Sequence, residues 1–236
     1  MNLLLSPIQS WIDKLDKTFI QSGYYKMIFE GLGNTVKITL GALAIGVIIG
    51  LIIAMIKYLA EDSRGMKPLA VLCDIYVTVI RGVPVTVLLL IFYYLIMASS
   101  TNGVLVATIT FGINSGAYMA ELIRSGINAV DKGQMEAGRS LGLSKMQTMR
   151  KIILPQAVRY VLPAVGNEFI ALLKETSVAG YVAVVDLTRA GNLVRNNTHD
   201  VFNPLMVVAL TYLIMVVILT KALGILERRL AKSDKR

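Results

Sequence analysis

Three long stretches of this chain are apolar and free of charged side chains. They cover 38–56, 98–120 and 201–220, and each is about as long as a helix must be to cross the hydrocarbon core of a bilayer. Hydrophobic residues make up 55% of the sequence and charged residues 17%, which is low for a soluble domain. Because a soluble core cannot absorb so much continuous apolar sequence, the sequence predicts an all-α membrane protein.

Two further stretches are long enough to span a bilayer although they contain charged residues. The stretch 70–97 carries Asp74 and Arg81, and 156–173 carries Arg159 and Glu168. The prediction is therefore five transmembrane helices. Pro84 is expected to break the second of these helices beside Arg81, since proline has no amide hydrogen and its ring clashes with the preceding turn. Small residues in the first helix favour its close approach to another helix; they are Gly41, Ala42, Ala44, Gly46 and Gly50.

The basic residues predict how the chain is oriented in the membrane. Five spans place the termini on opposite sides, and lysine and arginine are enriched in cytoplasmic segments of membrane proteins. An outside N-terminus and a cytoplasmic C-terminus give the inner segments most of the basic residues, including Lys57, Arg64 and Lys67, the 131–155 segment and the tail. This bias explains the net charge of +9 without a nucleic-acid partner. The basic tail, 229–236, is expected to lie near anionic lipid.

The first 30 residues do not resemble a cleavable signal peptide, because a basic start and a small-residue cleavage site are missing. Apolar residues recur there at helical spacing, namely Ile8, Trp11, Ile12, Leu15 and Phe19. The pattern indicates an amphipathic helix in the outer interface, with Trp11 at the headgroups, or a helix packed against a neighbouring span. We therefore expect an external segment, 1–30, a transmembrane domain, 31–228, and the tail.

The residue types that enzymes and metal sites need are scarce. Cys73 is the one cysteine and His199 the one histidine, so neither an internal disulfide nor a Cys/His metal cluster is expected. Cys73 fits a packing role in a span and His199 a solvated position. No G-x-x-x-x-G-K-[ST] loop is present, so ATP and Mg²⁺ would have to be bound by another subunit. The chain is therefore predicted to be non-catalytic and to bind no cofactor.

A charged segment, 131–163, separates two of the apolar stretches and predicts a helix–turn–helix. Asp131 can cap a first helix, and Gly142 suits the left-handed turn that ends it. Ser144 and Gln147 form a capping box for a second helix, and Pro155 indicates a break before the next span. The pair of helices can dock in a groove of a partner protein, or it can lie in the membrane interface without one. Four apolar side chains are available for contacts: Leu141, Leu143, Met146 and Met149.

The 131–155 segment resembles the cytoplasmic EAA loop of permeases of ATP-binding cassette (ABC) importers. That motif reads E-A-A, three residues, G, nine residues, I-x-L-P. Matching residues here are Glu136, Ala137, Gly138, Gly142, Ile152, Leu154 and Pro155, with Gly138 in place of the second alanine. The resemblance implies that this segment couples the chain to an ATPase, and it favours docking over the interfacial alternative.

Other stretches resemble permeases of polar amino acid importers. They are 31–35 (GLGNT), 80–84 (IRGVP), 114–118 (NSGAY) with Glu121 and Arg124, 174–177 (KETS) and 226–229 (LERR). Val83 and Glu175 depart mildly from the family pattern, which usually has threonine and often aspartate there. The resemblance implies the type I ABC importer permease fold in a bacterial cell membrane. It also implies three kinds of partner: two ATPase subunits, a second permease chain in a homodimer or heterodimer, and an external solute-binding protein.

Polar residues inside the spans are candidates for the substrate path, because an ionisable group at membrane depth is costly and usually functional. Arg81, Asn114 and Glu168 are predicted at similar depths near the middle of the membrane. Glu168 would accept the ammonium of an amino acid, while Arg81 and Asn114 would bind its carboxylate; Glu121 and Glu175 are secondary candidates. The structural alternative, slightly favoured for Arg81, is an Arg81–Glu168 or Asp74–Arg81 ion pair.

Two other classes of function remain possible on the sequence. An ATP-independent secondary amino acid transporter would often show internal repeats, and we find no convincing one. A non-transporting membrane scaffold has no evident need for polar groups inside its spans. The substrate is left open among lysine, arginine, histidine, glutamine, glutamate and cystine.

Overall fold

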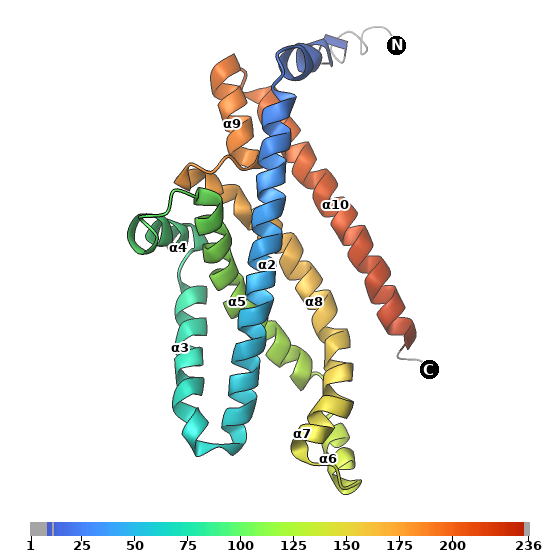
Figure 1. Ribbon diagram of the computed structural model, residues 1–236. Coiled ribbons are helices and arrows are strands. Elements are labelled where there is room, and N and C mark those ends of the chain that lie inside the picture. The colour runs from blue at the N-terminus through green and yellow to red at the C-terminus, as the bar shows by residue number, and fades with distance from the viewer. Residues whose placement is uncertain (1–8, 11, 234–236) are drawn as a thin grey trace.

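The described part of the chain, residues 9, 10 and 12–233 of a computed structural model, is built from helices and contains no strand (Figure 1). This confirms the all-α prediction. The helices follow one another as η1 (Asp16–Gln21), α2 (Tyr25–Asp62), η2 (Arg64–Met66), α3 (Lys67–Gly82), α4 (Val85–Ile91), η3 (Phe92–Ile96), α5 (Gly103–Asn128), α6 (Lys132–Ser140), α7 (Lys145–Thr148), η4 (Met149–Ile153), α8 (Leu154–Glu175), η5 (Thr176–Val182), α9 (Leu187–Thr198) and α10 (Phe202–Ser233).

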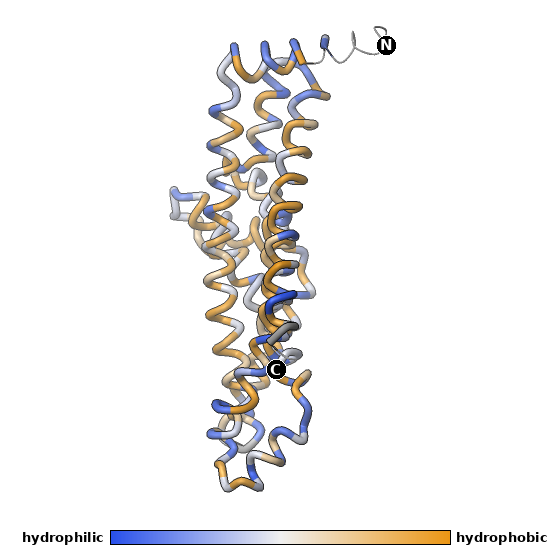
Figure 2. Tube along the Cα trace, turned by 90° about the vertical axis from the view of Figure 1, so that its right-hand side faces the viewer, coloured by the Kyte–Doolittle hydropathy of each residue, from blue (hydrophilic) through white to orange (hydrophobic). Residues whose placement is uncertain are grey.

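Helices occupy all five places at which the apolar pattern predicted a span. Among the described residues, α2, α5 and α10 are long and apolar enough to cross a membrane, and the bent pair of α3 and α4 makes up to four. Helix α8 does not meet the same criterion, since Arg159, Asn167 and Glu168 interrupt its apolar sequence. Its role as a fifth span stays a prediction. Figure 2 shows hydrophobic residues along the long helices and a concentration of hydrophilic residues at the end that holds α6 and α7.

The second predicted span is broken at Pro84, as the sequence indicated. Because a residue before proline avoids the helical region, Val83 is extended, with φ −100° and ψ 131°. Helix α4 then begins at Val85, and the segments Arg64–Gly82 and Val85–Ile96 meet at 106°. The stretch 70–97 is therefore not one straight crossing, because α4 runs nearly perpendicular to α3 (Figure 1).

Helices α2 and α5 lie side by side and form the centre of the fold (Figure 1). Their backbones approach closely because glycine faces a side chain of the other helix at several levels. A Cβ added to Gly50 would lie 2.5 Å from Cβ of Met119, and one added to Gly46 would lie 2.8 Å from Oγ of Ser115. The small residues of the first span thus serve helix packing, as expected.

The N-terminal segment packs against the protein. Phe19 is buried in a cluster with Ile28, Leu187 and Val208, and Leu15 lies against the same cluster. This favours the second of the two sequence-based alternatives for these residues, packing against neighbouring helices. The positions of Ile8 and Trp11 lie outside the described residues.

Helix α9 is tied to the first half of α2 by polar groups. Asp186 is fully buried and caps α9, accepting hydrogen bonds from the amides of Thr188 and Arg189. Burial raises the pKa of the Asp186 carboxyl, and those hydrogen bonds oppose the rise. The amide of Leu187 donates to Oγ1 of Thr35 over 3.0 Å, so the start of α9 is fixed against α2.

Candidate functional site

The 131–155 element has the local structure that its sequence predicts. Asp131 caps α6, accepting from the amide of Gly133 over 2.7 Å. Gly142 has φ +82°, a left-handed conformation in which a Cβ is unfavourable. The amide of Gly142 donates to the carbonyl of Arg139, and that of Leu143 to the carbonyl of Gly138, which together make a Schellman motif. The turn between the helices is therefore fixed by the backbone.

The second helix of the element begins at the predicted capping box. Oγ of Ser144 accepts from the amide of Gln147 over 3.2 Å, and Oε1 of Gln147 accepts from the amide of Ser144 over 2.8 Å. The break expected at Pro155 is wrong, because the chain stays helical from α7 through η4 into α8. Proline fits because η4 is a π-helix, in which the amide of Leu154 donates to the carbonyl of Met149, and Pro155 follows at the first turn of α8.

One face of the element packs against the ends of the spans and the other is free. Met149 and Ile153 are buried with Val130 and Ala157, so Met149 is not available to a partner, contrary to the sequence-based expectation. Leu141 is 81% exposed and Met146 47% exposed. The exposed residues of the motif itself are Glu136, Ala137, Gly142, Leu154 and Pro155.

Gly138 is buried where α6 meets α7 and η4. A Cβ at this position would collide with Cγ2 of Thr148 and would lie 3.2 Å from Cδ1 of Ile152. Glycine therefore fits this position, where the side chains of Thr148 and Ile152 leave no room for the alanine of the family motif.

Lys145 joins the 131–155 element to the end of α2. Its Nζ lies 3.3 Å from Oε2 of Glu61 and 5.0 Å from the centre of the Tyr58 ring. Both contacts come from the last turns of α2, so Lys145 connects α7 with this helix.

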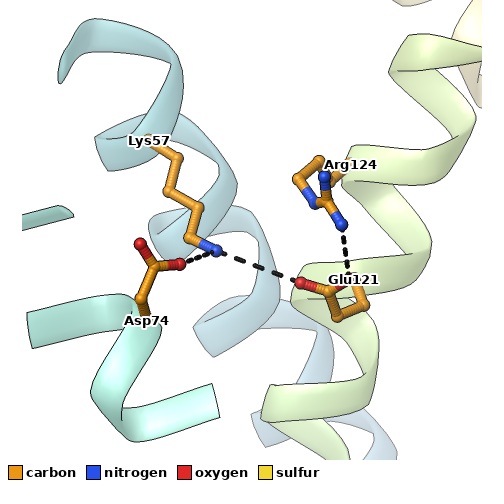
Figure 3. A network of polar contacts seen from close by, with 4 residues as sticks. All are labelled: Lys57, Asp74, Glu121 and Arg124. Carbon is orange, nitrogen blue, oxygen red and sulfur yellow. Dashed lines mark hydrogen bonds and ion pairs between the residues drawn. The ribbon is translucent and has the colours of Figure 1, made fainter. Parts of the chain in front are cut away.

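Figure 3 shows a charged network around Lys57, which lies one turn before Glu61 on α2. Nζ of Lys57 lies 2.5 Å from Oδ1 of Asp74 on α3 and 4.0 Å from Oε1 of Glu121 on α5, and Glu121 also pairs with Arg124 over 2.7 Å. Asp74 therefore pairs with Lys57 and not with Arg81. Glu121, a secondary substrate candidate, already has two cationic side chains beside it, those of Lys57 and Arg124. The ion pairs of Lys57 could not be predicted from the sequence, because its partners come from other helices.

The three substrate-path candidates lie around one turn of α5. Glu168 on α8 accepts a hydrogen bond from Oγ of Ser115 over 3.1 Å. Asn114, the residue before Ser115, is buried, with 3% of its surface exposed. Arg81 at the end of α3 lies 5.1 Å from the centre of the Tyr118 ring, one turn beyond Asn114. The predicted similarity of their depth in the membrane stays a prediction.

The predicted Arg81–Glu168 pair does not occur among the described residues. Arg81 is exposed and stacks on Tyr118, whereas Glu168 is half-buried and bonds to Ser115. Glu175 is half-buried at the C-terminal end of α8, two turns beyond Glu168. Ser115 and Tyr118 belong to the 114–118 stretch that resembles the family. They were not predicted as site residues, because charged side chains were favoured as candidates.

Comparisons with known proteins agree with this arrangement. Residues 46–232 match the family described as "Binding-protein-dependent transport system inner membrane component". The glutamine transport system permease protein GlnP of Rickettsia bellii is 37% identical over 210 residues, which cover 87% of this chain and 94% of that protein. The arginine transport system permease protein ArtQ of Bacillus subtilis is 33% identical over 210 residues, covering 88% and 94%.

Solved structures show the same fold. A chain of the "Crystal structure of an amino acid ABC transporter with histidines" superposes with a TM-score of 0.80 at 39% identity, covering 89% of this chain and 96% of that one. A chain of the MetNI methionine ABC transporter superposes with a TM-score of 0.73 at 19% identity, covering 86% and 96%. The predicted type I ABC importer permease fold is thereby confirmed.

Proposed function

Because the chain belongs to the inner membrane components of binding-protein-dependent transport systems, we propose that it forms the membrane path of an importer for a polar or charged amino acid. The chain is a permease subunit of an ABC importer. Its family membership argues against the two other classes considered, a secondary transporter and a scaffold without a transport role.

The amino acid proposal rests on Glu168 and its hydrogen bond with Ser115, the residue that follows Asn114 on α5. Glu168 is half-buried, and Ser115 supplies one hydrogen bond to its carboxylate. A carboxylate accepts several hydrogen bonds, so acceptor sites are left for the ammonium of an amino acid. Asn114 and Arg81, which lie on the same part of α5 or against it, would bind the carboxylate of the substrate. The names of the relatives, which refer to glutamine and arginine, support this substrate class.

The 131–155 element is the proposed docking site for an ATPase subunit, which would bind the ATP and Mg²⁺. Its exposed face offers Glu136, Ala137 and Leu141, and its buried face packs on the ends of α5 and α8. A second permease chain would complete the membrane path, and a solute-binding protein would deliver the substrate outside. This assignment places the 131–155 element and the C-terminus in the cytoplasm and the N-terminus outside.

Uptake by the reconstituted complex tests the proposal. Proteoliposomes would hold this permease with its ATPase, and labelled arginine, glutamine or histidine would be offered with the solute-binding protein. We expect uptake that needs both the solute-binding protein and internal ATP and that vanadate abolishes. Uptake driven by an ion gradient without ATP would contradict the proposal, as would ATP hydrolysis with no transport of any of the amino acids named above.

A further inference from the structure

A cavity of about 690 Å³ lies at the end of the molecule where α10 begins, far along the chain from the groups assigned to transport. One wall comes from the N-terminal segment and carries Lys14 and Lys17. The other wall comes from the connection between α9 and α10 and carries His199, Asp200 and Asn203. One wall of the cavity thus carries two cationic side chains, and the other carries an anionic side chain and an amide.

The side-chain oxygen of Asn203 lacks a hydrogen-bond donor within the described part of the chain. Its side chain is 4% exposed, and its Nδ2 donates to Oδ2 of Asp200 over 2.5 Å. Its Oδ1 is buried and has no hydrogen-bond partner within the described part of the chain. A buried acceptor without a donor is unfavourable, so this wall of the cavity suits a ligand that carries N–H groups.

Asp200 gives the same wall a negative charge. Its Oδ1 accepts from the amides of Phe202 and Asn203 over 3.0 and 3.1 Å. Burial raises the pKa of this carboxyl, but the hydrogen bonds and the nearby charge of Lys14 more than offset that effect and lower it. The carboxylate is therefore ionised at neutral pH and adds to the attraction for an ammonium group.

The opposite wall suits an anion. Lys14 and Lys17 are three residues apart in a helical segment, so they project from the same side, and both are exposed. Two ammonium groups at this spacing favour a phosphate, whose oxygens accept hydrogen bonds from both.

Apolar side chains in the lining of the cavity suit contact with the apolar part of a bilayer. Phe202, at the start of α10, is 59% exposed and Val201 is 62% exposed. A soluble ligand would leave these side chains in water, whereas the acyl chains of a lipid would cover them.

We propose that this cavity binds one phospholipid whose headgroup carries both a phosphate and a primary amine. The phosphate lies between Lys14 and Lys17, and the ammonium donates to Oδ1 of Asn203 beside Asp200. The acyl chains run along Phe202 and the start of α10. The site links the N-terminal segment to α10 through the lipid, and it does not depend on which amino acid the protein transports.

Native mass spectrometry of the purified full-length protein in its complex tests this site. One lipid is added at a time: phosphatidylethanolamine, phosphatidylglycerol, which has no amine, or phosphatidylcholine, which has no N–H donor. We expect one phosphatidylethanolamine per chain, bound about tenfold more tightly than the other two, which is the effect of about one hydrogen bond to a charged group. Equal retention of the three lipids would overturn the proposal.

Substitutions separate the two walls of the cavity. The double change Lys14→Gln with Lys17→Gln should weaken retention of all three lipids, because each carries the phosphate. Asn203→Leu should lower retention of phosphatidylethanolamine to the level of phosphatidylglycerol. Lys26→Gln is the matched control, since Lys26 is exposed at the start of α2 but does not line the cavity, and retention should not change.

Two outcomes would reject the lipid assignment. One is retention that is the same in the lysine double variant and the Lys26 control. The other is displacement of phosphatidylethanolamine by free arginine or glutamine, which would make the cavity a substrate site. Melting temperatures identify misfolded variants. If Asn203→Leu does not fold, the lysine double variant and the comparison of headgroups decide.

Discussion

Oγ of Ser115 on α5 donates a hydrogen bond to Oε1 of Glu168 on α8 over 3.1 Å. A neutral hydroxyl therefore holds the acidic side chain of the proposed substrate path, and no cation from the described residues neutralises it. A carboxylate with a neutral partner keeps its charge available to a ligand, whereas a carboxylate in a structural ion pair does not. This contact removes Arg81 as the partner of Glu168 among the described residues, and the substrate role of Glu168 is our proposal.

Glu168→Gln should strongly lower uptake while the complex assembles normally. The amide keeps an oxygen that Ser115 can donate to, so the free energy of unfolding should change by about 1 kcal/mol or less. Losing the charge removes a hydrogen bond to the substrate ammonium worth about 1.5–3 kcal/mol, which lowers uptake about tenfold or more. Uptake, complex yield and melting temperature are measured together.

Ser115→Ala is the matched control for this change. It removes the hydroxyl and leaves the charge of Glu168, so uptake should fall less than in Glu168→Gln. A Glu168→Gln variant with wild-type uptake would exclude the substrate role. Glu175 would then be the next residue to examine, since Glu121 already pairs with Lys57 and Arg124.

Gly138→Ala should destabilise the 131–155 element although alanine is the family's usual residue. The added methyl group collides with Cγ2 of Thr148, and overpacking of this kind costs about 1–3 kcal/mol. Thr148→Ala removes both Cγ2 and Oγ1, which lies 2.8 Å from the added methyl group, although it also removes the hydrogen bond to the carbonyl of Ser144. The double variant should therefore recover part of the melting temperature lost in Gly138→Ala, and equal stability of Gly138→Ala and wild type would refute this account.

Gly142→Val should uncouple ATP hydrolysis from transport. A β-branched residue is strained at φ +82°, so the second helix would leave its position. Asparagine tolerates the left-handed conformation, so Gly142→Asn should behave nearly as wild type. Co-purification of the ATPase and the ratio of transport to ATP hydrolysis are the measurements. Unchanged assembly and coupling in Gly142→Val would count against docking at this element.

Lys57→Met should destabilise the protein more than Asp74→Asn. Lys57 lies near two carboxylates, those of Asp74 and Glu121, whereas Asp74 is largely exposed. Removing the lysine leaves acidic groups close together at a helix junction and should cost about 1–3 kcal/mol. Lys67→Met provides the control, because Lys67 is exposed near the same surface and has no ion pair among the described residues. Thermal unfolding that ranks Asp74→Asn as the more harmful change would contradict this arrangement.

Cysteine labelling checks the orientation in the membrane. In a Cys73→Ala background, Ser10→Cys should react with an impermeant thiol reagent in intact cells and Ser140→Cys should not. Both side chains are exposed in the structure, so accessibility within the protein is comparable. Labelling of Ser140→Cys alone would invert the topology.

The local parts of this structure could be predicted from sequence because their signals are local. Asp131, Gly142 and the pair Ser144 and Gln147 each fix a cap or a turn within a few residues, and all of them have the predicted geometry. The break at Pro84 was predicted for the same reason. The angle of 106° was not, because it depends on what α4 packs against.

Features that depend on contacts between distant parts of the chain could not be predicted from the sequence. Pro155 was expected to end a helix, but burial of Met149 and Ile153 keeps the chain helical and η4 accommodates the proline. The partners of Lys57 come from α3 and α5, and no pattern in the sequence joins them. Opposite charges within the spans suggested a pair of Arg81 with Asp74 or Glu168, but these residues have other partners.

Helix α2 runs for 38 residues without a proline, about 57 Å at 1.5 Å per residue. Close to its C-terminal end Glu61 pairs with Lys145, and Thr35, which lies 26 residues earlier or about 39 Å along the axis, binds the start of α9. A rod of this length exceeds the full thickness of a bilayer with its headgroups, about 40–45 Å. One continuous helix therefore connects the contact with α7 to the contact with α9, and no loop lies between them.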